Sequence, residues 1–285
     1  MLKILIIGNS HSTDAFQLLS EAFRDQMPHQ DVAMASLYYS GCSITQHNKH
    51  IDEDAAVYRY TINKNGVSEA IENVTILYGL KDQNWDIVML QAAKSDRDET
   101  LNLAGRRKLE KYVDDNVPKP YVFAWHNSWP SPNDETFFSP SWVRQPPKGY
   151  KDNLTRLYGF DPVNQFTIQT QQTADLIVPD DTYKYKINTG AAIMQAHLTQ
   201  KIPQLELWRD YTHLHDFGRL IAAYSMYAQL TGNKITSIGM DIVPVDKRHY
   251  QFKHLGDMQI TEEMKQAIME AVNYSLEHPW TIPEQ

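Results

Sequence analysis

The sequence lacks several features that define whole classes of proteins. Its 285 residues include one cysteine, Cys42, which excludes an internal disulfide and a cysteine-rich zinc site. No apolar stretch approaches the roughly 20 residues that a membrane-spanning helix needs. The start, Met1-Leu2-Lys3 followed by four apolar residues, is too short for a signal peptide. We therefore expect a cytoplasmic protein without a membrane partner, unless a signal peptide was removed.

Basic clusters and the glycine loops of nucleotide-binding proteins are also missing. The formal net charge is -8, and no run of Lys or Arg exceeds a pair such as Arg106-Arg107, which argues against a nucleic-acid partner. There is no Walker loop, no G-x-G-x-x-G and no G-x-S-x-G nucleophile elbow. We expect a small or neutral partner and no cofactor, and the sequence leaves a homo-oligomer open.

The composition is that of an ordinary globular protein, with 42% hydrophobic and 22% charged residues. Short apolar runs that predict strands alternate with amphipathic segments that predict helices. This alternation indicates a doubly wound parallel sheet in one α/β domain covering residues 1–285. Strands are expected at 4–7, 31–39, 85–91, 121–125, 183–187 and 238–245, and helices at 15–27, 101–115, 164–176, 191–198, 219–230 and 262–276.

Two stretches interrupt this alternation. Residues 44–84 are polar and irregular, with helical spacing around Gly66 to Glu72. An excursion at about 127–165 is rich in proline and in aromatic residues such as Trp129 and Trp142, so regular elements are not expected there. Long aromatic loops are often functional, and this one fits a substrate-binding flap or a subunit contact equally well.

Ser10 lies where the first predicted strand gives way to a helix, in the sequence Gly8-Asn9-Ser10. A hydroxyl at this turn projects from the carboxyl edge of a parallel sheet, beside the backbone N–H groups that open the helix. Ser10 is therefore a candidate nucleophile. The alternative is that Ser10 or Ser12 merely caps the helix.

Other polar positions follow later strands and are expected at the same edge. Gly41 lies in a turn after the second strand, Gln91 is the last residue of the third strand, and His126 follows the fourth. The alternative for Gly41 is a simple turn glycine. Cys42 beside it is either a thiolate nucleophile or, more commonly for such a residue, a small buried thiol.

Asp210 and His213 are three residues apart, so one turn can bring the carboxylate onto Nδ1 of the imidazole. That contact fixes the tautomer and prepares Nε2 to accept a proton, which would complete a Ser10–His213–Asp210 relay. Two alternatives remain open. The pair can cap the following helix, or the His213-x-His215-Asp216 run can bind a metal with His11 and His126 approaching.

Taken together and in this order, these stretches resemble the blocks of the SGNH (GDSL) hydrolases. Within that superfamily the chain resembles the DUF4886 branch through Ile-Gly-Asn-Ser-x-Ser at the start, Leu90-Gln91 and the late Asp-x-x-His-Leu-x-x-x-Gly of residues 210–218. The phrase Val178-Pro179 and the stretch Asn188-Thr189-Gly190-Ala191-Ala192-Ile193 are also similar. The resemblance covers roughly residues 1–232.

The resemblance implies a flavodoxin-like three-layer α/β/α fold with a five-stranded parallel sheet, and ester hydrolysis through an acyl-serine. Carried over by position, Ser10 is the nucleophile, His213 the general base and then acid, and Asp210 its orienting partner. The oxyanion hole would comprise the N–H groups of Ser10 and Gly41 with the amide of Gln91. Gln91 stands where most SGNH enzymes have an Asn, and His11 where this branch more often has an apolar residue.

The leading hypothesis is a serine esterase that acts on a small-molecule or glycan ester, such as an O-acetylated sugar. The aromatic excursion suggests stacking on a sugar ring, which adds Trp129 and Trp142 to a substrate pocket that also contains His11 and His126. The competing hypotheses are a non-catalytic carbohydrate-binding protein on the same fold and a metal-dependent hydrolase at His213 and His215.

Overall fold

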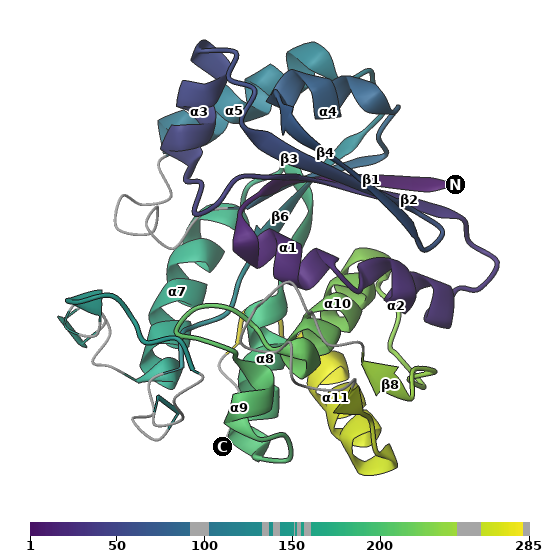
Figure 1. The fold of residues 1–285 in the computed structure, drawn as a ribbon, viewed down its shortest axis with the longest axis vertical. Coiled ribbons are helices and arrows are strands. Elements are labelled where there is room, and N and C mark those ends of the chain that lie inside the picture. The colour runs from purple at the N-terminus through teal and green to yellow at the C-terminus, as the bar shows by residue number, and fades with distance from the viewer. Residues whose placement is uncertain are drawn as a thin grey trace. The chain divides into compact units, whose positions relative to one another are not determined.

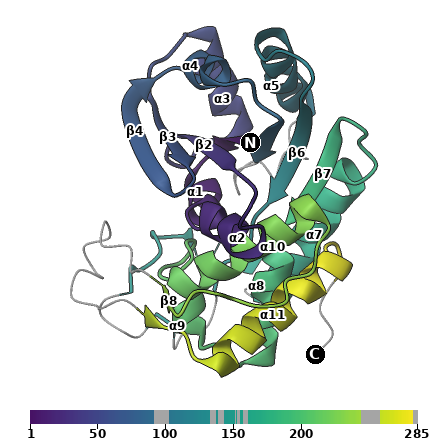
Figure 2. The same ribbon diagram turned by 90° about the vertical axis from the view of Figure 1, so that its right-hand side faces the viewer.

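The computed structural model describes residues 1–91, 103–132, 137–138, 143–150, 152, 155–156, 161–243 and 258–281. Contacts divide the chain into two compact units. The first comprises Met1–Ser128 and Gln172–Ile187 and contains the large sheet, and the second comprises Trp129–Gln171 and Asn188–Gln285. Figures 1 and 2 show the elements of each unit. The sequence had offered no boundary at these positions.

The first unit is built on a seven-stranded sheet with the order β4-β3-β2-β1-β5-β6-β7. β1 is parallel to β2 on one side and to β5 on the other, and β5 is parallel to β6. Residues Ile4 to Ile7 of β1 are at most 1% exposed, because a strand with no polar alternation is buried on both faces. The α/β prediction is confirmed. β7 lies beside β6 at the edge of the sheet. The bounds of these five strands are β1 (Leu2–Gly8), β2 (Val32–Tyr38), β5 (Ile87–Gln91), β6 (Val122–Asn127) and β7 (Tyr183–Asn188).

Two strands that the sequence did not predict extend the sheet beyond β2. β3 (Tyr58–Lys64) and β4 (Val67–Val74) pair antiparallel, so the sheet has seven strands rather than five and is not wholly parallel. The helical spacing assigned to residues 66–72 was wrong. Asn65 and Gly66 join the strands with φ of 51° and 91°, and Asn-Gly is the pair that favours such a two-residue hairpin turn.

Helices cover both faces of this sheet within the first unit (Figure 1). α1 (Ser10–Phe16) and α2 (Leu19–Gln26) pack on one face, so the single helix predicted for residues 15–27 is two shorter ones. α3 (Ile44–Asp52), α4 (Ile76–Asp82) and α5 (Leu103–Asn116) lie on the other. α3 and α4 begin at hydroxyl caps on Ser43 and Thr75, which accept N–H groups at 3.1 and 3.2 Å. The stretch expected to be irregular is thus largely ordered.

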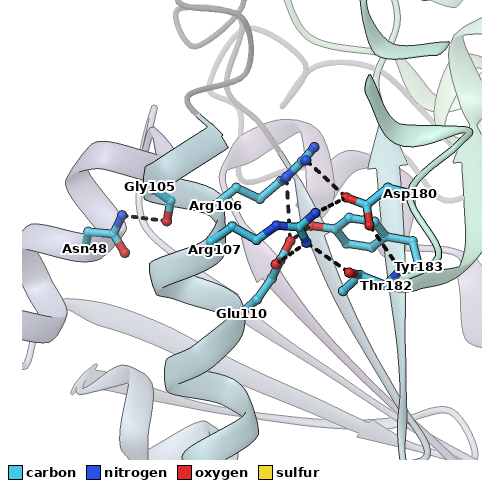
Figure 3. A network of polar contacts seen from close by, with 8 residues as sticks. All are labelled: Asn48, Gly105, Arg106, Arg107, Glu110, Asp180, Thr182 and Tyr183. Carbon is cyan, nitrogen blue, oxygen red and sulfur yellow. Dashed lines mark hydrogen bonds and ion pairs between the residues drawn. The ribbon is translucent and has the colours of Figure 1, made fainter. Parts of the chain in front are cut away.

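A charged network fixes α5 against the turn that precedes β7 (Figure 3). Arg106 and Arg107 both donate to Asp180, at 3.1 and 2.7 Å, and Arg107 also donates to Glu110 at 2.6 Å. The Tyr183 hydroxyl donates to the other oxygen of Glu110. Because two carboxylates face two guanidinium groups, the charge of Arg106, whose side chain is 2% exposed, is balanced where it is buried.

The second unit is formed by helices around α10 (Asp216–Thr231). α8 (Thr189–Thr199) and α11 (Glu262–Glu277) pack against α10 and against each other, and α9 (Gln204–Leu207) contacts α8 and α10. Nearly all of α10 is buried, so it forms the core of this unit. The remaining elements are α7 (Pro162–Ile177), whose residues from Gln172 belong to the first unit, and the short pair β8 (Ile242–Val243) and β9 (Met258–Gln259). Among the described helices, none combines the length and apolarity needed to cross a membrane.

Candidate active site

Ser10 is the first residue of α1, directly after the turn that ends β1. The N-cap of this helix is Asn9, whose Oδ1 accepts the His11 N–H at 3.0 Å. The interpretation of Ser10 or Ser12 as the helix cap was therefore wrong. The side-chain amide of Asn9 also donates to the Cys42 carbonyl at 3.1 Å. Asn9 thus ties the Ser10 turn to the turn after β2, a role that the sequence did not reveal.

Gly41 lies in that second turn, which the Cys42 N–H closes by donating to the Tyr39 carbonyl at 3.2 Å. Gly41 has φ of +64°, a left-handed conformation that glycine adopts without strain. This turn follows the carboxyl end of β2, which lies next to the end of β1 that leads into Ser10.

Gln91 ends β5 on the other side of β1. Leu90 pairs with Ile7 in the sheet register, which brings Gln91 level with the end of β1. Its Oε1 accepts the Ser12 N–H at 3.1 Å, and it also accepts the Ser12 hydroxyl. Ser10, Gly41 and Gln91 therefore lie at one edge of the sheet, as predicted, and their joint role as an oxyanion hole stays a prediction.

Two predicted substrate-pocket residues, His11 and His126, lie near this edge and are buried. The Nδ1 of His11 is 3.1 Å from the Ser128 hydroxyl. His126 pairs with Gln91 in the register of β5 and β6. Both histidines are thus packed inside the first unit. A contact of either one with substrate stays a prediction. Trp142, the fourth predicted residue of this pocket, lies outside the described residues.

A polar cluster that the sequence did not reveal lies next to the Gly41 turn. The Tyr58 hydroxyl is 2.8 Å from Nδ1 of His47 and 2.9 Å from Nδ1 of His50. Burial, with the charge of His50 adding to it, lowers the pKa of His47 to about 3. The Cys42 thiol is 3.9 Å from the same hydroxyl and is 0% exposed. Cys42 is thus a buried thiol rather than an accessible nucleophile.

Asp210 and His213 form a dyad in the second unit, as their spacing predicted. The Nδ1 of His213 is 3.0 and 2.9 Å from the two carboxylate oxygens of Asp210. The Oδ1 of Asp210 also accepts the backbone N–H groups of Thr212 and His213, at 2.9 and 2.8 Å. Because the ionised carboxylate accepts a hydrogen bond from Nδ1–H, Nε2 is the unprotonated, basic nitrogen of His213.

Asp210 is 3% exposed, yet its carboxyl group stays ionised. Burial raises its pKa, but the hydrogen bond and charge of His213, the charge of Arg209 and the Thr212 N–H outweigh burial and lower the pKa to about 2. A carboxylate that is charged throughout the neutral range can orient a histidine and stabilise its protonated form.

Trp129 supports the loop that carries this dyad. Its indole N–H donates to the Thr212 carbonyl at 3.0 Å, and the ring is 0% exposed. In the same region the indole N–H of Trp208 donates to the Pro130 carbonyl at 3.1 Å. The sequence placed Trp129 in the substrate pocket as a sugar-stacking ring. In the structure it packs within the second unit and fixes the loop between Asp210 and His213.

A second part of the excursion holds the same loop through Tyr150. The Tyr150 hydroxyl donates to the Tyr211 carbonyl at 3.3 Å and is 2.6 Å from the Ser131 hydroxyl. Its ring packs edge-on against that of Tyr211, and Arg144 lies 5.7 Å from the centre of the Tyr211 ring. Trp129 and Tyr150 of the excursion therefore hold the loop that carries the dyad, a role that the sequence did not predict.

His215, which the sequence suggested as a metal ligand together with His213, caps the N-terminus of α10. Its Nδ1 accepts the Asp216 N–H at 2.8 Å, and Asp216 pairs with Arg219 at 2.8 Å. Burial and the charges of Arg219 and Arg209 lower the pKa of His215 to about 3, so its imidazole is neutral. Across the described ranges, no three His, Cys, Asp or Glu side chains are grouped to hold a metal ion.

We expect His215 to make the protein sensitive to acid. Because the folded pKa lies below the ordinary value of 6.5, its contribution to stability is present above pH 6.5 and is lost as the pH falls towards 3. His215→Asn replaces the capping Nδ1 by an amide oxygen, which is also a good N-cap acceptor but does not titrate. The free energy of unfolding should then fall less steeply below pH 6.5, by up to about 1.4 kcal/mol per pH unit. An unchanged pH profile in urea denaturation would contradict this assignment.

Comparison with known proteins identifies related chains. The model of the family described as domain of unknown function DUF4886 matches residues 3–252. No curated protein matches the sequence. A crystal structure of a DUF4886 family protein from Bacteroides uniformis is 22% identical, with a TM-score of 0.75 over 99% of this chain and 97% of that one. This similarity shows a shared fold.

Two further solved structures are more distant. A proposed SGNH hydrolase from Slackia heliotrinireducens is 15% identical, with a TM-score of 0.42 over 80% of this chain and 98% of that one. A gut microbial diltiazem-metabolizing enzyme is 14% identical, with a TM-score of 0.44 over 86% of this chain and 54% of that one.

Proposed function

The chain belongs to the DUF4886 family, and we propose that it is an SGNH-type serine esterase, which hydrolyses a small acyl ester through an acyl-serine intermediate. The observation that carries the proposal is the Asp210–His213 dyad. The Asp210 carboxylate accepts hydrogen bonds from Nδ1 of the imidazole and from two backbone N–H groups. These bonds fix the orientation of the ring and leave Nε2 as the base. The nucleophile that we assign to that base is Ser10, the first residue of α1.

In the proposed reaction, Nε2 of His213 removes the proton of the Ser10 hydroxyl as Oγ attacks the ester carbonyl carbon. The resulting oxyanion accepts the N–H groups of Ser10 and Gly41 and the amide of Gln91. His213 then returns the proton to the leaving alcohol, and an acyl group remains on Ser10. A water molecule, deprotonated by His213, releases the acid and restores the hydroxyl.

The structure supports the acyl-ester part of the substrate hypothesis better than its carbohydrate part. Ser10, Gly41 and Gln91 supply an attacking hydroxyl and hydrogen-bond donors for a tetrahedral intermediate, and these act on any small acyl group. The sugar-stacking part of the hypothesis rested on two tryptophans. Trp129 is buried under the dyad loop, so Trp142, outside the described residues, is the aromatic ring that remains for it.

The first test is hydrolysis of p-nitrophenyl acetate by the full chain, followed by release of p-nitrophenolate. We expect turnover by the wild type that persists in the presence of a chelator. Turnover that is lost with chelator and restored by a metal ion would favour the metal-dependent hydrolase. Glycan binding in calorimetry with no hydrolysis of any acyl ester would favour the non-catalytic carbohydrate-binding protein.

Trp129→Phe tests the support of the dyad. The variant keeps an aromatic ring at this position, smaller than the indole, and removes the N–H donated to the Thr212 carbonyl. Because misplacement of a catalytic group by about 1 Å can cost on the order of 100-fold, we expect kcat to fall by about 10-fold to 100-fold. The matched control is Trp85→Phe, which removes an N–H donated to Gly79 at the same distance of 3.0 Å in the first unit. Equal kcat values for the two variants would contradict a positioning role for Trp129.

A further inference from the structure

We propose that Ser12 is a positioning residue that orients the side-chain amide of Gln91, so that Nε2 of Gln91 is the donor offered to the oxyanion. The inference rests on the proposed esterase function and extends it to a residue with no assigned role. Ser10 and Ser12 would then divide the work of the Gly-x-Ser-x-Ser stretch. Ser10 is partly exposed and reacts, whereas Ser12 is 0% exposed and sets the geometry of a neighbouring donor.

The hydrogen bonds at Oε1 define which end of the amide faces α1. Oε1 accepts the Ser12 N–H at 3.1 Å, the Asn9 N–H at 3.5 Å and the Ser12 hydroxyl. A backbone N–H can only donate, so the amide atom that faces two of them must be the oxygen. The nitrogen therefore occupies the other end of the amide, turned away from these donors.

Nε2 of Gln91 is a buried donor in need of an acceptor. Gln91 is 1% exposed, and among the described residues Nε2 has no hydrogen-bond partner. A buried donor without a partner is unfavourable, and such groups concentrate where a ligand or transition state completes them. An oxyanion formed at Ser10 would supply the missing acceptor. The extra methylene of Gln91, compared with an asparagine, is accommodated because Ser12 fixes the far end of the side chain.

Gly8 makes room for this contact. A Cβ built on Gly8 would lie 2.1 Å from the Ser12 hydroxyl oxygen and 2.8 Å from Oε1 of Gln91. Any side chain at position 8 would therefore displace the Ser12–Gln91 pair. The glycine that ends β1 is thus explained by a close approach of two side chains over the end of the strand.

Steady-state kinetics with p-nitrophenyl acetate test the inference. Gln91→Glu keeps the acceptor for Ser12 but replaces the amide donor by a carboxylate oxygen, and kcat should fall by about 100-fold to 1000-fold. Ser12→Ala removes one of the three hydrogen bonds at Oε1, and kcat should fall by about 5-fold, with KM changed by less than about 2-fold. In a Gln91→Met background, Ser12→Ala should lower kcat by no more than about 2-fold, because Ser12 acts through the amide.

The matched control is Ser20→Ala, a buried serine of α2 whose hydroxyl donates to Glu21 at 2.8 Å. It should leave kcat unchanged. If Ser12→Ala keeps the wild-type kcat, or if its effect is undiminished in the Gln91→Met background, the inference is overturned.

A measurement on the wild type decides the matter even where a variant fails to fold. A fluorophosphonate would place a phosphonyl oxygen at the oxyanion position of Ser10. The protein is enriched with ¹⁵N-glutamine, and the side-chain NH₂ signals of Gln91 are assigned by their loss in Gln91→Glu or by sequential through-bond spectra. These signals should move downfield when the fluorophosphonate reacts with Ser10. Labelled Ser10 with unmoved Gln91 signals would overturn the inference alone. Absence of both labelling and hydrolysis would overturn the proposed function and the inference with it.

Discussion

Replacing Ser10 by alanine is expected to lower kcat for p-nitrophenyl acetate by about 10⁴-fold to 10⁶-fold, which corresponds to about 5 to 8 kcal/mol of activation free energy. The reason is that alanine leaves the dyad and the proposed oxyanion donors in place but removes the atom that forms the acyl bond. The backbone of α1 should be unaffected, because its cap is Asn9 and not Ser10. Initial rates at saturating substrate give the comparison.

Ser20→Ala is again the control for this variant, because it removes a serine hydroxyl from the adjacent helix and should retain wild-type kcat. Thermal unfolding of both variants checks that the fold is intact. If Ser10→Ala hydrolyses the ester at the wild-type rate, the nucleophile lies elsewhere and the proposed mechanism is wrong.

Asp210→Asn should have the second-largest effect, a fall in kcat of about 10⁴-fold. The asparagine oxygen can still accept the N–H groups of Thr212 and His213, so the loop should keep its shape. Its NH₂ group, however, would face Nδ1 of His213 and require that nitrogen to be an acceptor. The proton then resides on Nε2, which can no longer take the proton of Ser10.

This variant separates a role in tautomer selection from a role in loop stability. A melting temperature near that of the wild type with strongly reduced kcat is the expected combination. Asp181→Asn, at an exposed position, is the control for loss of one carboxylate. In a serine protease triad, loss of the orienting carboxylate lowers kcat by about 10⁴-fold. If Asp210→Asn retains more than about a tenth of the wild-type kcat, the dyad does not serve catalysis.

The fold was predictable where burial imposes a pattern on the sequence. β1 is buried on both faces and shows as an uninterrupted apolar run, and the same holds for much of β5. β4 is exposed along all but its last residue, so no hydrophobic period marks it as a strand. The signal that was present is the Asn65-Gly66 turn, because both residues adopt positive φ.

The candidate site shows a similar division. Ser10, Gly41 and Gln91 were predicted to share one edge of the sheet because each stands at the end of a predicted strand, and the structure places them at one edge. Their supporting contacts were not predictable. Ser12 and Gln91 are 79 residues apart in the chain, and no local pattern reports such a pairing.

Trp129 shows why a residue type alone does not define a role. An indole has a large apolar face and one N–H donor, so it suits both a sugar-binding surface and a buried support. The distinction depends on its partner, the Thr212 carbonyl, which lies 83 residues away. The sequence therefore predicted a substrate contact for Trp129, whereas its hydrogen bond in the folded chain is to the loop that carries Asp210 and His213.

The central claim, that Ser10 is a nucleophile activated by the Asp210–His213 dyad, is tested most directly by covalent labelling. The full chain is treated with a fluorophosphonate and digested, and the peptides are analysed by mass spectrometry. We expect one adduct per chain, on the peptide that contains Ser10, and labelling that is strongly slowed in His213→Ala. Labelling of a different residue, or an adduct at Ser10 that forms equally fast without His213, would contradict it.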